Sequence, residues 1–248
     1  MEHDYQTGLL LSHGDYESST GDQPPYDEPP GYDTAEPPEV RRGLPWERRD
    51  ELGPAPAIIQ TISQVLSSPS RAFADMKVDG GWGEPLGFAV LVGSVSSWIG
   101  QAWIMLLNSS MAGLAGFSAE EVAAENARAI ISAFATPFLI CILTVVLAGI
   151  THLLLILFGG APRPYETTFR VFCYTASVGA VNVIPFCGLF IGIVWAWVVR
   201  IIGLREAHPV PTGRAAAAVL VPLLLWCFCI MVAALLFAGV AGLAMGNL

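Results

Sequence analysis

Charge is the first thing that this sequence lacks. Only 13% of its 248 residues are Asp, Glu, Lys or Arg, against about 25% in an ordinary soluble domain. Hydrophobic residues make up 54%, which favours several long apolar runs over one soluble core. Basic residues are scarcer still, with 12 Lys and Arg against 21 Asp and Glu. This balance argues against nucleic acid as a partner, because phosphate binding requires a basic surface.

Patterns typical of catalysis and of metal binding are also absent. HExxH, GxSxG, Walker A and GxGxxG motifs do not occur in a supporting context. None of the five cysteines forms a CxxC pair, and no His or Asp cluster completes a ligand set, so we expect each to pack as a small hydrophobic residue. We therefore expect neither an enzyme nor a bound cofactor or metal. We also expect no signal peptide, since the apolar run Leu9–Leu11 is too short for one.

Acidic residues and proline are concentrated in the first 55 positions. This stretch holds 13 acids and 4 arginines, so it carries the entire net charge of -9. Its prolines disrupt regular structure, and its polarity leaves too little apolar surface to offset ordering, so we predict a disordered tail over residues 1–55. Pro29, Pro30 and Tyr32 fit the PPxY pattern bound by WW domains, and a solvated spacer is the alternative interpretation.

Residues 56–84 are predicted to form short amphipathic helices. Ile58, Ile62 and Val65 share one helical face, and Ser68 followed by Pro69 is typical of a helix start. Two placements remain open at this level. The helices could lie in the membrane interface or pack on the membrane domain, and the absence of lysine from the polar face favours packing or weak attachment.

Apolar segments then fill residues 85–248. Five spans are predicted, at about 85–107, 129–158, 170–184, 188–202 and 215–244. The third and fourth are short and form a hairpin at Pro185, a polar loop separates the first two, and Ser118 with Glu121 forms a capping box before the second. The predicted fold is an all-α integral membrane protein. It is a five-span helical bundle preceded by the tail and the short amphipathic helices.

Small residues spaced four apart predict close helix contacts. They fall on the first, fourth and fifth spans, and they are Ser96 and Gly100, then Gly188, Gly192 and Ala196, then Ala238 and Gly242. The same stripes are compatible with a homo-oligomer.

A few polar residues are candidates for function. His152 and Asn182 lie inside predicted spans, and Arg205, Glu206 and His208 lie in the loop after the fourth. Ionisable groups within a membrane are functional candidates by default, although a neutral, hydrogen-bonded His152 near the interface and an interhelical bond from Asn182 are the simpler interpretations. The alternative is a polar path for a small transporter through His152, Asn182 and Gln101. The absence of charge at the centre of every span argues against it.

Topology follows from the distribution of Lys and Arg. With the N-terminus in the cytoplasm and the C-terminus outside, eleven of the twelve bases are cytoplasmic and Arg128 alone is outside. For a bacterial protein this corresponds to the inner or plasma membrane.

Several short motifs occur in a characteristic order along the chain. They are Ser68 to Phe73, Phe172-Cys173-Tyr174, Val183-Ile184-Pro185, Trp195, the run from Ile202 to His208 and Gly213-Arg214-Ala215. In these motifs the chain resembles bacterial members of the Yip domain family, over about residues 56–240. The resemblance implies a helical bundle with a cytosolic N-terminus. In eukaryotic relatives it implies vesicle trafficking and binding of prenylated GTPases. Glu51-Leu52-Gly53-Pro54 lacks one residue of the eukaryotic Asp-Leu-x-Gly-Pro motif, and the resemblance supplies no catalytic or ligand residue.

These features together predict a non-enzymatic membrane protein that organises membranes or binds partners. Its expected partners are membrane lipid and proteins that contact the tail or the cytoplasmic loops.

Overall fold

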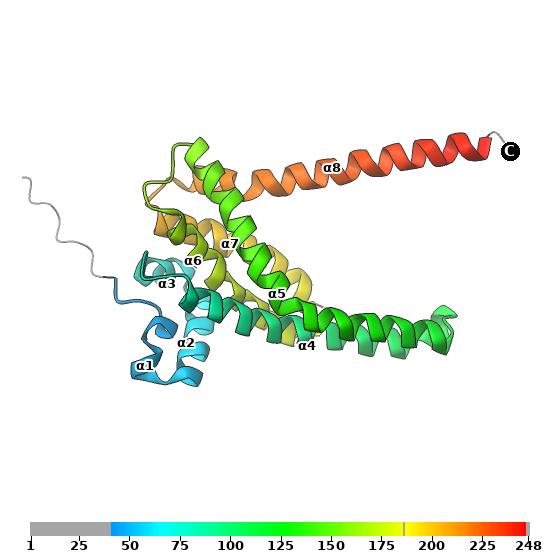
Figure 1. The fold of residues 1–248 in the computed structure, drawn as a ribbon, viewed down its shortest axis with the longest axis horizontal. Coiled ribbons are helices and arrows are strands. Elements are labelled where there is room, and N and C mark those ends of the chain that lie inside the picture. Colours follow the sequence, from blue (N-terminus) through cyan, green and yellow to red (C-terminus); the bar gives the residue numbers. More distant parts are fainter. Residues whose placement is uncertain (1–40, 186, 247–248) are drawn as a thin grey trace, which may run out of the picture. The chain divides into compact units, whose positions relative to one another are not determined.

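A computed structural model describes residues 41–185 and 187–246, with the side chains of all of these except 113–115, 226 and 238–246. Pro29, Pro30 and Tyr32 lie outside the described residues, as do the side chains of Ala238 and Gly242. All regular structure in the described part is helical, as predicted (Figure 1). The elements are η1 (Pro45–Arg48), α1 (Arg49–Leu52), α2 (Pro54–Ser67), α3 (Pro69–Asp75), α4 (Gly83–Ala115), α5 (Ala119–Leu157), α6 (Tyr165–Thr175), η2 (Ala176–Val183), α7 (Gly188–Ala207) and α8 (Thr212–Gly246).

Four of the described helices are long and apolar enough to cross a membrane. They are Gly83–Ala112 of α4, all of α5, all of α7, and Thr212–Phe237 of α8. The chain is therefore an integral, multi-pass membrane protein. Five spans were predicted, and four single helices within the described residues are long enough to be spans. The segment predicted as the third span, 170–184, is instead divided between α6 and η2.

The α6 part of this segment differs from a lipid-facing span because protein surrounds it, whereas Val183 and Ile184 at the far end are 59% and 51% exposed. Every residue from Thr167 to Thr175 is buried. In η2, Gly179 lies so close to α4 that an added Cβ atom would sit 2.7 Å from Cβ of Ser96. The predicted third span therefore corresponds to two consecutive helical segments, of which α6 is enclosed by protein.

Helices α4 and α5 are longer than predicted. The polar loop predicted from residue 108 is shorter than expected, because α4 continues to Ala115, and the short helix predicted after the capping box is continuous with α5, which begins at Ala119. The capping box is present, with the backbone N–H of Ser118 donating to Glu121 at 2.8 Å and Ser118 Oγ accepting from the N–H of Glu121 at 3.2 Å. Pro137 lies inside α5, and Figure 1 shows this helix changing direction along its length, as expected where proline removes a backbone hydrogen bond.

Residues 41–55 depart from the predicted disorder. Leu44 is fully buried in the main core, and the Trp46 indole packs on Phe88 with ring centroids 5.7 Å apart. Its backbone N–H donates to Thr61 Oγ1 at 2.9 Å. Proline and acid content predicted a tail to residue 55, but one leucine and one tryptophan provide enough apolar surface to fix this stretch on the bundle.

Helices α2 and α3 pack on the bundle, which is one of the two predicted placements. Val65 of α2 and Phe73 of α3 are fully buried in the same core as residues of α6, α7 and α8. The side chain of Ser68 forms no N-capping hydrogen bond, contrary to the prediction, although α3 does begin at Pro69. We name residues 41–82 the N-terminal cap.

Candidate functional site

Two of the predicted polar residues, His152 and His208, meet at the ends of three helices. Thr168 of α6 stands between them. Its Oγ1 atom lies 2.8 Å from Nδ1 of His152 on α5 and 2.8 Å from Nε2 of His208 at the end of α7. The two imidazole centroids are 5.8 Å apart. We name these three residues the junction.

The hydrogen bonds of the junction determine which nitrogen of each histidine carries a proton. A threonine hydroxyl has one hydrogen, so it donates to one imidazole and accepts from the other. Nδ1 of His208 is buried and has no hydrogen-bond partner in the described part of the chain. An orphaned N–H costs more than an orphaned lone pair, so the favoured state has His208 donating through Nε2 and Thr168 donating to His152. The arrangement carries no net charge, and it offers neither a nucleophile nor a metal-ligand set.

Acidification is expected to destabilise the protein through His208. Burial, with a smaller effect from His152 and Arg163, lowers the pKa of His208 to about 4. A histidine in an unfolded chain has a pKa near 6.5, so between about pH 6.5 and pH 4 the unfolded state binds more protons than the folded state. The free energy of unfolding therefore decreases as the pH is lowered through this range. We expect the free energy of unfolding to fall by about 2 kcal/mol between about pH 6.5 and about pH 5. A denaturation series on the wild type and His208→Gln tests this, and equal slopes for the two would contradict it.

Backbone contacts around the junction bring four helix ends together. Arg163, just before α6, donates to the carbonyl of Ala207 at the end of α7. Arg214, at the start of α8, donates to the carbonyl of Gly159 after α5 at 2.7 Å. The end of α5, the start of α6, the end of α7 and the start of α8 therefore lie on one side of the bundle.

The predicted loop residues Arg205 and Glu206 lie beside the junction, in the last turn of α7. They pair with each other, and Nη2 of Arg205 lies 3.3 Å from Oγ of Ser70 on α3. Arg41 donates to the carbonyl of Glu206 at 3.1 Å and to that of Phe73 at 2.9 Å. These contacts attach the N-terminal cap to the end of α7, so Arg205 and Glu206 have structural partners in this state.

A buried ion pair between Glu47 and Arg170 also attaches the N-terminal cap to the bundle. Glu47 Oε1 accepts from Arg170 Nη1 at 2.7 Å and from the Tyr174 hydroxyl at 3.1 Å, and Oε2 accepts from the backbone N–H groups of Leu44 at 2.8 Å and Lys77 at 3.0 Å. Both charged side chains are completely buried. We name Glu47, Arg170, Tyr174 and Lys77 the latch. Its pair is fully hydrogen-bonded, which is the condition under which a buried pair is tolerated.

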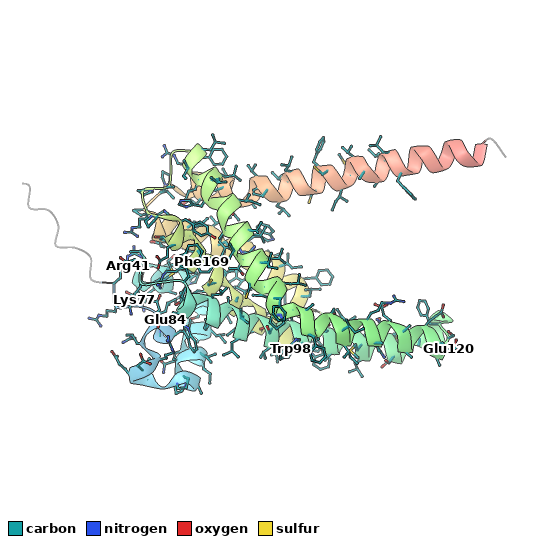
Figure 2. All side chains as sticks on the ribbon, in the orientation of Figure 1. Arg41, Lys77, Glu84, Trp98, Glu120 and Phe169 are labelled. Atoms are coloured by element: carbon teal, nitrogen blue, oxygen red, sulfur yellow. The ribbon has the colours of Figure 1, made fainter. Side chains whose placement is uncertain are left out.

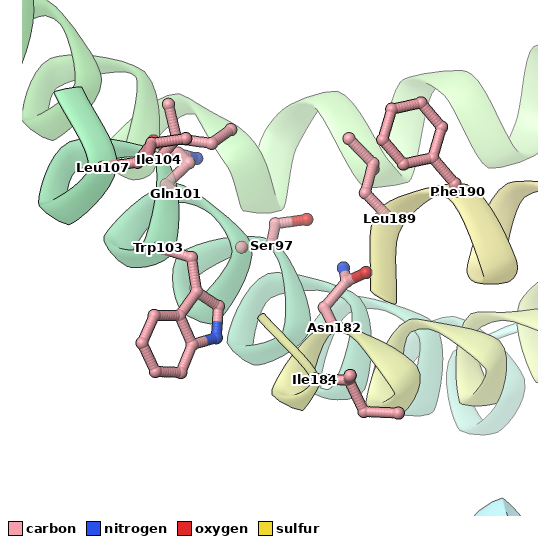
Figure 3. Close-up of a pocket in the computed structure, with 10 residues that line it drawn as sticks. Ser97, Gln101, Trp103, Ile104, Leu107, Asn182, Ile184, Leu189 and Phe190 are labelled. Carbon is pink, nitrogen blue, oxygen red and sulfur yellow. The ribbon is translucent and has the colours of Figure 1, made fainter. Parts of the chain in front are cut away.

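Asn182 belongs to a different region. Its Nδ2 atom donates to the carbonyl of Ser96 at 3.3 Å, the interhelical bond that the sequence favoured. Asn182 also lines an apolar groove of about 530 Å³ with Gln101 and Trp103 (Figure 3). His152 does not line this groove, so the three residues of the hypothetical transport path belong to two separate sites.

The small residues differ in how tightly they are packed. A Cβ atom on Gly188 would meet the carbonyl oxygen of Val181 at 2.4 Å, whereas one on Gly192 or Gly100 would have its nearest neighbour, in Asn182, at 3.8 or 3.7 Å. Ala196 lies half-buried against the main core.

Sequence reasoning missed the latch and Thr168. Arg170 was interpreted as a topological charge, and Glu47 as one acid among 13 in the tail. The available signal for Glu47 was its position beside Leu44 and Trp46, two apolar residues in an otherwise polar stretch. Nothing in the spacing of Thr168 indicates that it lies between two histidines.

A family model matches most of the chain. The family model described as the Yip1 domain matches residues 63–242. No curated protein matches the chain, and no solved structure does. The matched range includes the junction and Arg170 but begins after Glu47, so the latch joins a residue outside the match to one within it.

Proposed function

Because the chain belongs to the Yip1 domain family, we propose that it is a non-enzymatic membrane scaffold whose N-terminal cap and preceding tail present binding surfaces for other proteins. The observation that carries this proposal is the attachment of residues 41–82 to the helix ends. A buried pair, Glu47 with Arg170, holds a small polar body on a domain whose remaining exposed surface is largely apolar.

The orientation we propose places this cap in the cytoplasm. Arg41, Lys77 and Glu84 lie toward one end of α4, and Glu120 lies at the other end (Figure 2). Arg128, beside the far end, pairs with Glu125 at 2.8 Å. Because basic residues favour the cytoplasmic side of a membrane, the cap end is expected inside.

We also propose that α6 and η2 together make the fifth crossing. Eleven residues of α-helix and eight of 3-10 helix extend about 30 Å, close to the thickness of a hydrocarbon core. Enclosure by neighbouring helices would satisfy the backbone of such a segment. Since the start of α6 lies beside the end of α7, α8 leaves the cytoplasmic side and the C-terminus lies outside.

Capture of partners from cells tests the scaffold role. Full-length protein and a variant lacking residues 2–40 are compared after crosslinking in intact cells, because this deletion leaves the latch in place. We expect the deletion to remove partners of the tail without changing the unfolding midpoint. Tyr32→Ala is the matched point variant, and it is expected to remove any partner that contains a WW domain. An identical set of partners for all three proteins would contradict a role for the tail.

A further inference from the structure

Arg200 of α7 is a half-buried cation for which the described chain provides no anion. Its guanidinium carbon lies 5.0 Å from the ring centroid of Phe172 and 5.5 Å from that of Trp197. It forms no hydrogen bond or ion pair with any described residue, and its Nε atom is buried without a partner. The contrast is Arg170, which has two carboxylate partners, Glu47 and Glu166. Aromatic faces offset only part of the cost of burying a charge.

A cavity of about 270 Å³ adjoins this arginine. Residues of α4, α5, α6, η2 and α7 line it. Hydroxyl groups lie on its wall, from Ser96, Ser97, Thr144 and Thr175, and apolar side chains such as Ile140 and Ile193 complete it. One cation, several hydroxyls and the Asn182 amide, with apolar side chains on the rest of the wall, match a ligand that has an anionic head and a hydrocarbon tail.

The position of Arg200 along α7 indicates the source of that ligand. Arg200 precedes Ala207, the last residue of α7, by seven positions, which is about 10 Å of helix. This places the guanidinium inward from the helix ends, at the level where headgroups and acyl chains meet.

We propose that Arg200 and this cavity bind the phosphate of an anionic phospholipid from the leaflet on the side where α7 ends. Arginine matches phosphate because its planar fork donates two parallel hydrogen bonds. Wall hydroxyls other than that of Thr175, which already donates to the carbonyl of Val171 at 2.7 Å, donate to the remaining oxygens. One acyl chain lies along the apolar wall. An anionic headgroup suits the site better than a zwitterionic one, because choline brings its own cation to a site that already has an excess positive charge.

Native mass spectrometry of the full-length protein in mild detergent tests the proposal. Phosphatidylglycerol, phosphatidylcholine, diacylglycerol and inorganic phosphate are the separate probes. We expect wild-type protein to retain phosphatidylglycerol about tenfold better than phosphatidylcholine, and Arg200→Gln to retain it about tenfold less than wild type. Arg200→Lys, which keeps the charge but loses the fork, should fall between. Arg71→Gln, a matched change at an exposed arginine of the cap, should match wild type.

A second variant tests the same cavity without changing Arg200, so the proposal can still be tested if the Arg200 variants misfold. Thr144→Met fills the cavity without altering the charge, and it is expected to lower retention of phosphatidylglycerol while the protein remains monodisperse. The proposal is overturned if wild type retains both phospholipids equally, or if Arg200→Gln or Thr144→Met retains phosphatidylglycerol at the wild-type level. Displacement of the lipid by inorganic phosphate at equal concentration would also overturn it, since that result identifies a site for a soluble ion.

Discussion

Replacing Arg170 with methionine is expected to lower the free energy of unfolding by about 3–5 kcal/mol. The change leaves Glu47 completely buried without its cation, although the backbone N–H groups of Leu44 and Lys77 still donate to it. It also removes the bond from Arg170 Nη2 to the carbonyl of Gly81, at 2.9 Å, which is one of several hydrogen bonds between the cap and α6. Unfolding in detergent, followed by circular dichroism during titration with a denaturing detergent, measures the loss.

An exposed pair provides the control for this prediction. Arg128 and Glu125 are also in ionic contact, but their side chains are 73% and 55% exposed, so Arg128→Gln should cost less than about 1 kcal/mol. The double change Glu47→Gln with Arg170→Met should recover part of the loss, because it removes both charges from the interior. A loss for Arg170→Met no larger than that for Arg128→Gln would show that the latch is not buried as described.

Gly188→Ala is expected to be the most damaging change among the small residues of the spans. The new methyl group would meet the carbonyl oxygen of Val181 at 2.4 Å and Cα of Asn182 at 3.0 Å. Both are backbone atoms, so no change of rotamer relieves the overlap, and η2 must move away from the start of α7. We expect a loss of about 2–3 kcal/mol in the same unfolding measurement.

Gly192→Ala and Gly100→Ala are the matched controls on the same helix and on α4. Their new methyl groups would have their nearest neighbours, in Asn182, at ordinary contact distances of 3.8 and 3.7 Å. Alanine also favours helix over glycine by about 1 kcal/mol, so both variants should be neutral or slightly stabilised. If Gly188→Ala is as stable as Gly192→Ala, the close approach of η2 to α7 is wrong.

Sequence patterns predicted the parts of this fold that depend on hydrophobicity and local chemistry. Apolar runs of sufficient length located α4, α5, α7 and α8, and Ser118 with Glu121 marked the start of α5. Both signals are local, because a span needs about 20 apolar residues and a capping box needs four.

Features that depend on tertiary contacts could not be predicted from local sequence patterns. Thr168 is one of several hydroxyl residues in α6, and its position between two histidines depends on where α5 and α7 end. Glu47 resembles its acidic neighbours until Arg170, 123 positions later, is placed against it. The division of the third predicted span into α6 and η2, and the enclosure of α6 by neighbouring helices, depend on the same kind of contact.

Accessibility of single cysteines to a membrane-impermeant maleimide tests the orientation of the cap most directly. The five native cysteines are first replaced, and a cysteine is then introduced by Arg71→Cys in the cap or by Glu120→Cys at the far end, both at exposed positions. The proposed orientation predicts that the Glu120→Cys variant reacts in intact cells and that the Arg71→Cys variant reacts only after permeabilisation. Reaction of Arg71→Cys in intact cells, with Glu120→Cys silent until permeabilisation, would contradict it.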